Sequence, residues 1–286
     1  MSKTKTTVIA NPWQSLRRFT AARIALGRAG VSQPTEPHLD FELAHARARD
    51  AVHLTLDAKA LAQSLPMSLA QQGVQGVSCI ALCSAAENRN IYLQRPDLGR
   101  RLDAASRQAL KALREEDRGD ARPYDLAFVI ADGLSALAIE QNAMPFLQAV
   151  ISRLRSENWS FAPIGIVSQG RVAIGDEVGQ LLDAKAVVVL IGERPGLSSP
   201  DSMGLYLTWM PQVGTTDAGR NCISNVRPAG LSYEEAAFKL HYLMSEARKR
   251  QLSGVHLKDE TDGSAAGPAR RDAPQKNFLL PGDDAL

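Results

Sequence analysis

The sequence predicts an α/β protein, in which an N-terminal helical region precedes a Rossmann-like, mainly parallel sheet flanked by helices. Three observations predict this class: short continuous apolar runs recur along the chain, helical patterns alternate with them, and glycine-containing turns follow them. Continuous apolar strands are typical of parallel sheets, because helices cover both faces of such a sheet. We therefore divide the chain into a helical region, residues 1–72, a Rossmann-like domain, 73–252, and a tail, 253–286.

The N-terminal region is rich in Ala and Arg and is expected to be helical. Residues 21–26 predict a short helix that ends at Gly27 and Gly30, because glycine commonly terminates helices. Residues 39–54 predict a second helix, because apolar side chains recur there at helical spacing. These side chains are Phe41, Ala44, Ala48 and Val52.

The Rossmann-like domain is expected to begin with a strand over residues 74–82. An amphipathic helix over 103–114 follows, and then a loop over 120–125. The three most apolar runs come next and predict the central strands; they are residues 126–130, 164–167 and 186–191. Between the first two runs, apolar residues at helical spacing predict a helix; they are Leu147, Val150, Ile151 and Leu154. Residues 205–209 and 222–226 are further candidate strands.

The last predicted helix begins after Ser232. Ser232 and Glu235 have the spacing of a capping box, in which each side chain satisfies a free backbone N–H group of the other residue. Apolar residues then form one helix face; they are Ala236, Leu240, Leu243 and Ala247. Beyond Ser253 the sequence is polar and contains Gly, Ala and Pro, and we expect this tail to be disordered.

The composition excludes several classes of protein. The formal net charge of the 286 residues is +2, which gives no electrostatic reason to bind nucleic acid or an anionic membrane. The longest apolar stretch, residues 186–191, is far shorter than the roughly 20 residues of a membrane span. The N-terminus lacks the apolar run of a secretory signal. Three cysteines are too few for a disulfide framework, which favours a reducing cytoplasm.

Ligands of open α/β sheets bind beyond the carboxyl ends of the strands. Three segments fit this position: ADGLS at 131–135, SQGRV at 168–172 and GERPGL at 192–197. Ordinary strand-to-helix turns remain the alternative. The phosphate-binding patterns GxxxxGK[ST] and GxGxxG do not occur, so nothing supports a kinase, a GTPase or a dinucleotide-dependent dehydrogenase.

No metal site is predicted, because the five histidines show neither HExxH nor Cys/His spacing. His45 and His53 lie two helical turns apart, too far for one ion, and are interpreted as solvated or structural. Cys79 and Cys83 lie in an apolar run and are interpreted as core residues, since the reactive spacing is CxxC. No Ser-His-Asp arrangement is indicated, so no catalytic residue is predicted.

Several charged residues flank the predicted strands. Glu193 and Arg194 directly follow the most apolar run and are either ligand contacts or a local ion pair, with the ion pair slightly favoured. The same alternatives hold for the segment 217–221, which contains Asp217, Arg220 and Asn221. Asp176 and Glu177 do not face each other on a helix, and we interpret them as a solvated face or as acids of a first helical turn.

Six segments, taken together and in order, resemble the small (light) chain of ethanolamine ammonia-lyase. They are TAARIALGRAG (20–30), IYLQRPDLGRRL (91–102), VIADGLSALAI (129–139), GRVAIGDEVGQLL (170–182), LIGERPGLSSPDSMGLYLT (190–208) and RNCISNVRPAG (220–230). One segment alone would be weak evidence, but the six in order span nearly all of residues 20–250. The polar C-terminal tail lies outside the resemblance.

The resemblance implies an enzyme that converts ethanolamine to acetaldehyde and ammonia by radical chemistry with adenosylcobalamin. The cofactor performs the difficult step, and the protein supplies binding and orientation. In this family the large subunit holds the substrate and the radical-handling residues, and the small subunit closes over the corrinoid at the interface. The family's small chain has a helical part and a Rossmann-like part, which agrees with the fold predicted above.

Three residues match cobalamin contacts of the family: Val172 in GRV, Glu193 in GERPGL and Cys222 in RNCISN. Val172 would offer apolar contact. Glu193 would accept hydrogen bonds from the corrin amides, and Arg194 beside it would keep it ionised. Cys222 would be a contact surface and not a cobalt ligand. The pattern DxHxxG is absent, which leaves base-on binding, as in the family.

Encapsulation in a bacterial microcompartment is doubtful, because about twenty residues precede the first matching segment and they are not clearly amphipathic; we expect the free cytoplasm. Two other functions stay open. The chain could be an independent nucleotide- or small-molecule-binding module, which would need no large partner. It could also be an assembly protein whose exposed helices, such as 39–54, make contacts without touching a cofactor.

Overall fold

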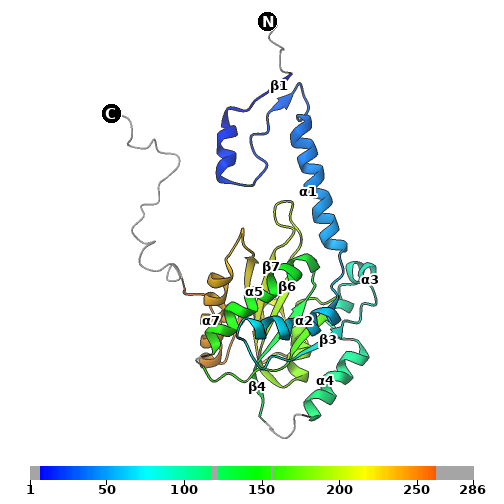
Figure 1. The fold of residues 1–286 in the computed structure, drawn as a ribbon, viewed down its shortest axis with the longest axis vertical. Coiled ribbons are helices and arrows are strands. Elements are labelled where there is room, and N and C mark those ends of the chain that lie inside the picture. Colours follow the sequence, from blue (N-terminus) through cyan, green and yellow to red (C-terminus); the bar gives the residue numbers. More distant parts are fainter. Residues whose placement is uncertain (1–6, 117–121, 156, 262–286) are drawn as a thin grey trace, which may run out of the picture.

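The computed structural model describes residues 7–116, 122–155 and 157–261. A six-stranded sheet lies at the centre of the fold, in the order β3-β5-β4-β6-β7-β8 (Figure 1). The strands are β3 (Cys79–Cys83), β4 (Tyr124–Ala131), β5 (Ile164–Ser168), β6 (Ala184–Gly192), β7 (Met203–Trp209) and β8 (Arg220–Val226). The first four strands in space run parallel, and β7 and β8 add antiparallel pairs at one edge. The predicted mainly parallel α/β sheet is therefore confirmed.

Each apolar run became a strand buried on both faces. Along β6 from Ala186 to Ile191, residues of even number, such as Val188, contact one hydrophobic cluster, and odd ones, such as Val189, contact the other. The first face carries α2 (Ala58–Gln71), α5 (Ala136–Leu154) and α7 (Tyr233–Arg250), and the second carries α4 (Ala104–Glu116) and α6 (Ile174–Leu181). This three-layer arrangement explains why the strands lack alternation: neither face meets water.

The helix α6 approaches the sheet closely because two of its residues are glycines. A Cβ atom on Gly175 would lie 2.2 Å from Val189 Cγ2, and one on Gly179 would lie 2.6 Å from Pro211 Cγ. A larger residue at either position would push the helix away from β6. The pair of glycines therefore fixes α6 directly over the second half of β6, which matters for the site described below.

The N-terminal part projects from the three-layer arrangement of the sheet and its helices. The helix α1 (Thr35–His53) extends away from the sheet and carries at its far end the 3-10 helix η1 (Pro12–Phe19) and a small hairpin of β1 (Val8–Ile9) and β2 (Arg28–Ala29) (Figure 1). The predicted helix over 39–54 is confirmed. The helix predicted over 21–26 is wrong: those residues have no helical structure, and Ala25 has a φ of +52°. Helical propensity alone does not form a helix where no core covers it.

Two short helices and one long one complete the predicted middle region. The chain passes from β3 through α3 (Arg89–Gln94) and the 3-10 turn η2 (Leu98–Arg100) to α4. The amphipathic helix expected over 103–114 is thus confirmed. The loop expected over 120–125 is wrong at its end, because Tyr124 and Asp125 already belong to β4, and residues 120 and 121 lie outside the described residues.

The capping box at the start of α7 is present as predicted: the Ser232 side chain and that of Glu235 each accept from the backbone N–H of the other residue. The disorder predicted beyond Ser253 is wrong for residues 254–261, where η5 (Gly254–His256) and the buried Leu257 pack beside β8. Residues 262–286 of that predicted tail lie outside the described residues. Among the described residues no helix is long and apolar enough to cross a membrane.

Candidate functional site

The turns after β4 and β5 are joined by one buried carboxylate. Asp132 is fully buried and accepts hydrogen bonds from the backbone N–H groups of Gln169 (3.0 Å) and Gly170 (2.9 Å). Arg89 of α3 reaches Asp132 at 3.4 Å and also donates to the carbonyl oxygen of Gly133 at 2.8 Å. Burial raises the pKa of Asp132 to about 6, although Arg89 and the backbone donors favour the carboxylate. Asp132 and Arg89 thus connect the carboxyl ends of β4 and β5.

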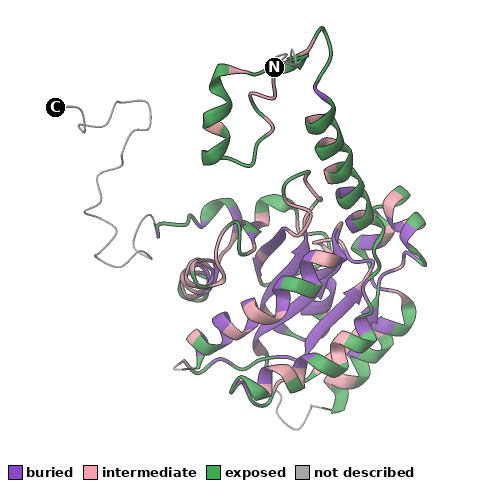
Figure 2. Ribbon diagram, turned by 45° about the horizontal axis from the view of Figure 1, so that its top comes forward, coloured by how far each residue is buried: buried purple, intermediate pink, exposed green. Residues whose placement is uncertain are grey.

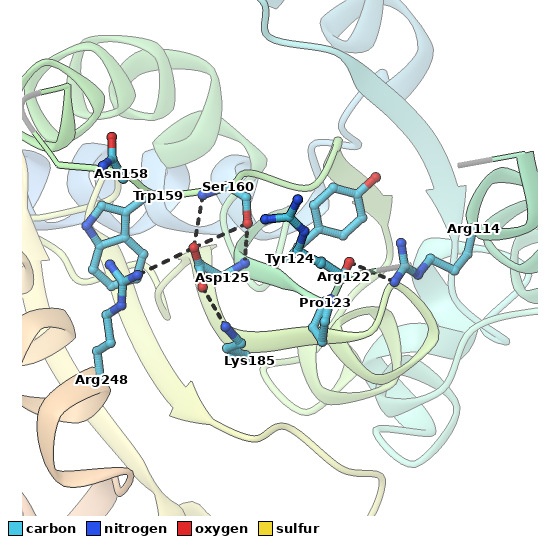
Figure 3. Close-up of a pocket in the computed structure, with 10 residues that line it drawn as sticks. All are labelled: Arg114, Arg122, Pro123, Tyr124, Asp125, Asn158, Trp159, Ser160, Lys185 and Arg248. Atoms are coloured by element: carbon cyan, nitrogen blue, oxygen red, sulfur yellow. Dashed lines mark hydrogen bonds and ion pairs between the residues drawn. The ribbon is translucent and has the colours of Figure 1, made fainter. Parts of the chain in front are cut away.

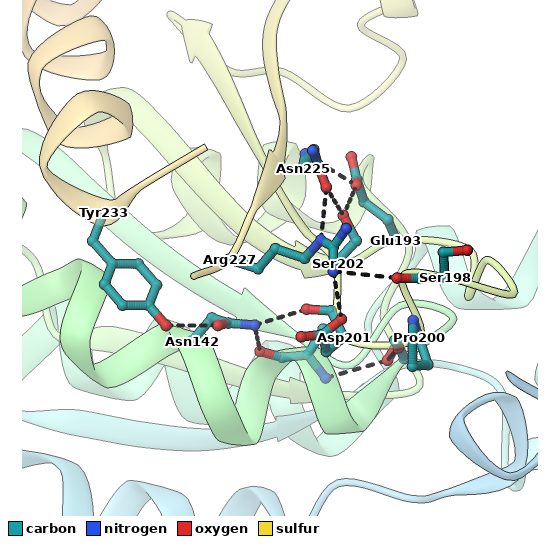
Figure 4. A network of polar contacts seen from close by, with 11 residues as sticks. Asn142, Glu193, Ser198, Pro200, Asp201, Ser202, Asn225, Arg227 and Tyr233 are labelled. Atoms are coloured by element: carbon teal, nitrogen blue, oxygen red, sulfur yellow. Dashed lines mark hydrogen bonds and ion pairs between the residues drawn. The ribbon is translucent and has the colours of Figure 1, made fainter. Parts of the chain in front are cut away.

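The turn after β6 carries Glu193, whose two carboxylate oxygens have different surroundings. Oε2 accepts from the Ser202 hydroxyl at 2.5 Å and from the Asn225 backbone N–H at 3.2 Å (Figure 4). The side chain lies over Gly204, where an added Cβ atom would be 3.0 Å from Oε1. Glu193 is therefore positioned over the start of β7, with space that a glycine provides.

Strand register brings Glu193 and Cys222 to the same face of the sheet, on either side of Tyr206. Tyr206 of β7 pairs with Cys222 of β8 and shares its face with Gly204, two residues earlier. Burial raises the pKa of Tyr206, and the neighbouring Cys222 thiol and Glu193 carboxylate raise it further. Cys222 and Ser224 are exposed. We call the group Glu193, Tyr206, Cys222 and Ser224 the open face.

Val172 lies in the turn just before α6, on the same side of the sheet as Tyr206 of the open face. Gly175, three residues later, sits over Val189, and Val189 pairs with Tyr206, which in turn pairs with Cys222. Val172 is half-buried and packs against the core cluster beneath α6. The three predicted site residues therefore flank one region of the sheet. Tyr206, Ser202 and Asn225 also belong to it; they lie within two of the resembling segments, but nothing in those segments singles them out.

A buried ion pair fastens α6 to the strand that carries Cys222. Asp176 of α6 pairs with Arg220 of β8, and both side chains are only 2 % exposed. Arg220 also donates to Asp217 at 2.8 Å and to the carbonyl oxygen of Thr215 at 2.7 Å. The local ion pair that the sequence suggested for Asp217 and Arg220 is thus present. Burial raises the pKa of Asp176, against the effect of Arg220.

Two interpretations of the charged residues need correction. Asp176 and Glu177 are first-turn acids, as expected, but they are not a solvated face: both are buried, and Glu177 binds Arg101 through two hydrogen bonds of 3.0 and 3.1 Å. The local ion pair favoured for Glu193 and Arg194 is wrong, since Glu193 binds Ser202 and Asn225 and no described contact joins it to Arg194.

A hollow of about 700 Å³ opens at the amino-terminal edge of the sheet, opposite the strand ends that carry Glu193 (Figure 3). Asp125 at its centre accepts from Lys185 at 2.9 Å and lies 3.6 Å from Arg248, which stacks on Trp159. Burial raises the pKa of Asp125, but Lys185, the Ser160 backbone and Arg248 outweigh it and hold the pKa below its ordinary value. Asp125 is thus bound by two of the basic residues that line the hollow, Lys185 and Arg248.

No group of His, Cys, Asp and Glu side chains in the described part of the chain could hold a metal ion. His45 and His53 are exposed, and His45 stacks on Phe41. All three cysteines are free thiols. Cys79 is half-buried and packs against the main core, which agrees with its interpretation as a core residue. The same interpretation is wrong for Cys83, because its side chain is exposed.

Known proteins resemble this chain over nearly its whole length. A family model described as Ethanolamine ammonia-lyase light chain (EutC) matches residues 10–258. The ethanolamine ammonia-lyase small subunit of Azotobacter vinelandii is 56% identical over 275 residues, which are 94% of this chain and 96% of the relative. That of Ralstonia nicotianae is 57% identical over 279 residues, 97% of each chain. That of Pseudomonas aeruginosa (strain LESB58) is 57% identical over 274 residues, 96% of each.

Proposed function

Because the chain belongs to the ethanolamine ammonia-lyase light-chain family, we propose that it is the small subunit of an adenosylcobalamin-dependent ethanolamine ammonia-lyase. In this proposal it completes the cobalamin site at the interface with the large catalytic subunit, and the complex converts ethanolamine to acetaldehyde and ammonia. The observation that carries the cofactor role is the open face, where Glu193 and Cys222 flank Tyr206. Val172 lies beside them at the start of α6.

The residues present fit a corrinoid. When bound, adenosylcobalamin supplies radical chemistry through homolysis of its cobalt–carbon bond. A corrin ring is broad and carries amide side chains, so it requires an open surface with hydrogen-bond acceptors. Gly204 makes room for the Glu193 side chain, whose carboxylate provides an acceptor, and the exposed Cys222 provides a small contact surface. We propose base-on binding, since the sequence lacks the DxHxxG pattern that supplies a histidine to cobalt.

The role of this chain is binding and orientation. Glu193 would accept from amide N–H groups at the corrin rim, and Val172 would make apolar contact from the start of α6. Cys222 would pack against the ligand as a small contact surface and not as a cobalt ligand. The ion pair of Asp176 with Arg220 would keep α6 and β8, and with them Val172 and Cys222, at a fixed separation. No residue of this chain is assigned to the chemical step.

A large-subunit partner would cover the apolar side chains that the N-terminal part exposes. Residues 7–53 are mostly exposed (Figure 2). Their exposed large apolar side chains are Val8, Ile9, Trp13, Phe19, Ile24, Val31, Leu39 and Leu43. Exposed apolar residues gathered on one part of a soluble protein are typical of protein–protein contacts. We propose that the projecting α1 and the segment before it bind the large subunit.

Reconstitution tests the proposal. Three samples are prepared: this chain alone, a large subunit of the family alone, and the two together. Each sample receives adenosylcobalamin and ethanolamine. Cob(II)alamin in the visible spectrum and acetaldehyde in a coupled assay are expected only when both chains are present. The proposal fails if the large subunit alone turns over at the rate of the pair, or if the pair neither binds the corrinoid nor forms acetaldehyde.

A further inference from the structure

The carboxylate of Glu193 is half satisfied by the protein. Its Oε2 atom accepts two hydrogen bonds, from Ser202 Oγ at 2.5 Å and from the Asn225 backbone N–H at 3.2 Å. Its Oε1 atom accepts none from any described residue and lies over Gly204, on the open face. A carboxylate held in this way by one oxygen presents the other oxygen in a fixed direction, as an acceptor for a donor from outside the chain.

Asn225, which makes one of these two hydrogen bonds, has an unusual backbone conformation. Its φ is +62°, in the left-handed region that Asn adopts more readily than most residues. The strand β8 has a register shift at this point, between the pairs of Leu205 and Met203. From this left-handed conformation Asn225 donates its N–H to Glu193 Oε2. Gly230 allows it, because a Cβ atom there would lie 2.3 Å from the Asn225 carbonyl oxygen.

Arg227 fixes the side chain of Asn225 and the loop that contains Ser202. Its Nε donates to Asn225 Oδ1 at 2.9 Å, and its Nη1 donates to Asp201 Oδ1 at 3.3 Å and to the Ser198 carbonyl oxygen at 3.4 Å (Figure 4). The Arg227 side chain itself is only 13 % exposed, although Asn225 lies at the surface. One guanidinium thus joins β8 to the loop after β6.

The same loop is also tied to α5. The fully buried Asn142 donates to the Asp201 carbonyl oxygen at 2.8 Å, and its own Oδ1 accepts from the Tyr233 hydroxyl at 2.8 Å. The Ser135 hydroxyl donates to the Pro200 carbonyl oxygen at 2.7 Å. These contacts come from a helix within the core, so Ser202 cannot shift without disturbing buried hydrogen bonds.

We propose that Ser202 and Asn225, anchored by Arg227, are positioning residues that hold Glu193 Oε2 so that Oε1 accepts a hydrogen bond from an amide of the corrin rim. This inference rests on the proposed function. It adds to it that the affinity for the corrinoid depends on a preorganised acceptor, because a fixed carboxylate loses less conformational entropy on binding than a mobile one. None of the three residues needs to contact the ligand.

A double-substitution cycle in the reconstituted two-chain complex tests this. The dissociation constant of adenosylcobalamin is measured by visible spectroscopy without ethanolamine for the wild type, Ser202→Ala, Glu193→Ala and the double variant. Ser202→Ala is expected to weaken binding about fivefold in the wild-type background and to have no further effect once Glu193 is alanine. A merely structural Ser202 would give the same factor in both backgrounds, and that result overturns the inference.

Ser199→Ala is the matched control. Ser199 lies in the same loop, and its hydroxyl makes no hydrogen bond with another described residue, so its removal is expected to leave the dissociation constant unchanged. If Ser202→Ala prevents assembly, Asn225→Gly replaces it. That variant keeps the left-handed backbone and the N–H donor but loses the anchor to Arg227, and it is expected to weaken binding only while Glu193 is present.

The results separate the inference from the proposed function. If the wild-type complex binds no corrinoid, the proposed function fails and the inference fails with it. If the complex binds the corrinoid and Glu193→Ala leaves the dissociation constant unchanged, the function stands, but Glu193 is not a contact and the inference is overturned. If Glu193→Ala weakens binding and Ser202→Ala and Asn225→Gly do not, only the positioning role is overturned.

Discussion

Replacing Arg220 by methionine should destabilise the fold far more than replacing Arg101 by methionine. The two arginines bind adjacent acids of α6, Asp176 and Glu177, so the comparison holds the helix constant. The pair of Arg220 and Asp176 is 2 % exposed on both sides, whereas the Arg101 side chain is 50 % exposed. Removing one partner of a buried pair leaves an uncompensated charge.

The magnitudes follow from these surroundings. Arg220→Met should lower the free energy of unfolding by about 3–5 kcal/mol, the usual cost of isolating a buried charge. Arg101→Met should cost no more than about 1 kcal/mol, because water screens this pair. Glu177 also keeps two other partners, the Leu102 backbone N–H at 2.8 Å and Arg107 at 3.5 Å. The second variant therefore loses one contact of several.

Urea unfolding followed by far-UV circular dichroism measures both costs. Adding Asp176→Asn to Arg220→Met should restore part of the lost stability, because the isolated charge disappears with the carboxylate. Equal losses for the two methionine variants would refute the reasoning, since they would mean that burial of the pair does not decide its contribution. No recovery in the double variant would show that the arginine acts by packing and not by charge.

Three other predictions concern separate parts of the molecule. Leu257→Ala should cost about 2–4 kcal/mol of unfolding free energy, whereas Val255→Ala, at a position 64 % exposed, should be nearly neutral; equal losses would show that residues 254–261 do not pack on the sheet. Burial raises the pKa of Asp132 from 3.8 to about 6, so the folded protein binds this proton more tightly than the unfolded chain does. The tighter binding contributes about 3 kcal/mol to stability, which is fully present below pH 4 and is lost as the pH rises through 6. Asp132→Asn should remove that decline in urea titrations between pH 4 and 7, and an unchanged slope would contradict it. Iodoacetamide should modify the exposed Cys222 and Cys83 well before Cys79, whose pKa burial raises to about 12; mass spectrometry of timed samples would reveal any other order.

The central sheet could be predicted because its signal is local. Beyond the charged residues at their starts, Asp125 and Lys185, the strands β4 and β6 are apolar and buried, so their burial and the helices on both sides follow from the residues themselves. The helix predicted over 21–26 failed for the opposite reason. Its residues have helical propensity but no core to pack against, and propensity alone is too weak to form a helix of six residues.

The partners of charged residues could not be predicted, because they come from distant segments. Asp176 binds Arg220, 44 residues later, and Glu177 binds Arg101, 76 residues earlier. A periodic pattern shows that two acids begin a helix, but it does not show which arginines the sheet brings to them. The same reason hid Tyr206 from the predicted site, since only the register of β7 with β8 places it beside Cys222.

The family resemblance identified Glu193 as a candidate cobalamin contact, and the structure adds the hydrogen bonds that hold its side chain. Glu193 stands in a recognisable segment, but nothing in that segment predicts that one of its oxygens is bound by Ser202 and Asn225 while the other is free. A carboxylate with both oxygens satisfied internally would be a structural residue, and one with both free would be mobile. In Glu193 one oxygen is bound within the protein and the other accepts no hydrogen bond from a described residue, which is the arrangement expected of a preorganised acceptor. The affinity of the site should therefore depend on β8 and on the loop after β6 as much as on Glu193 itself.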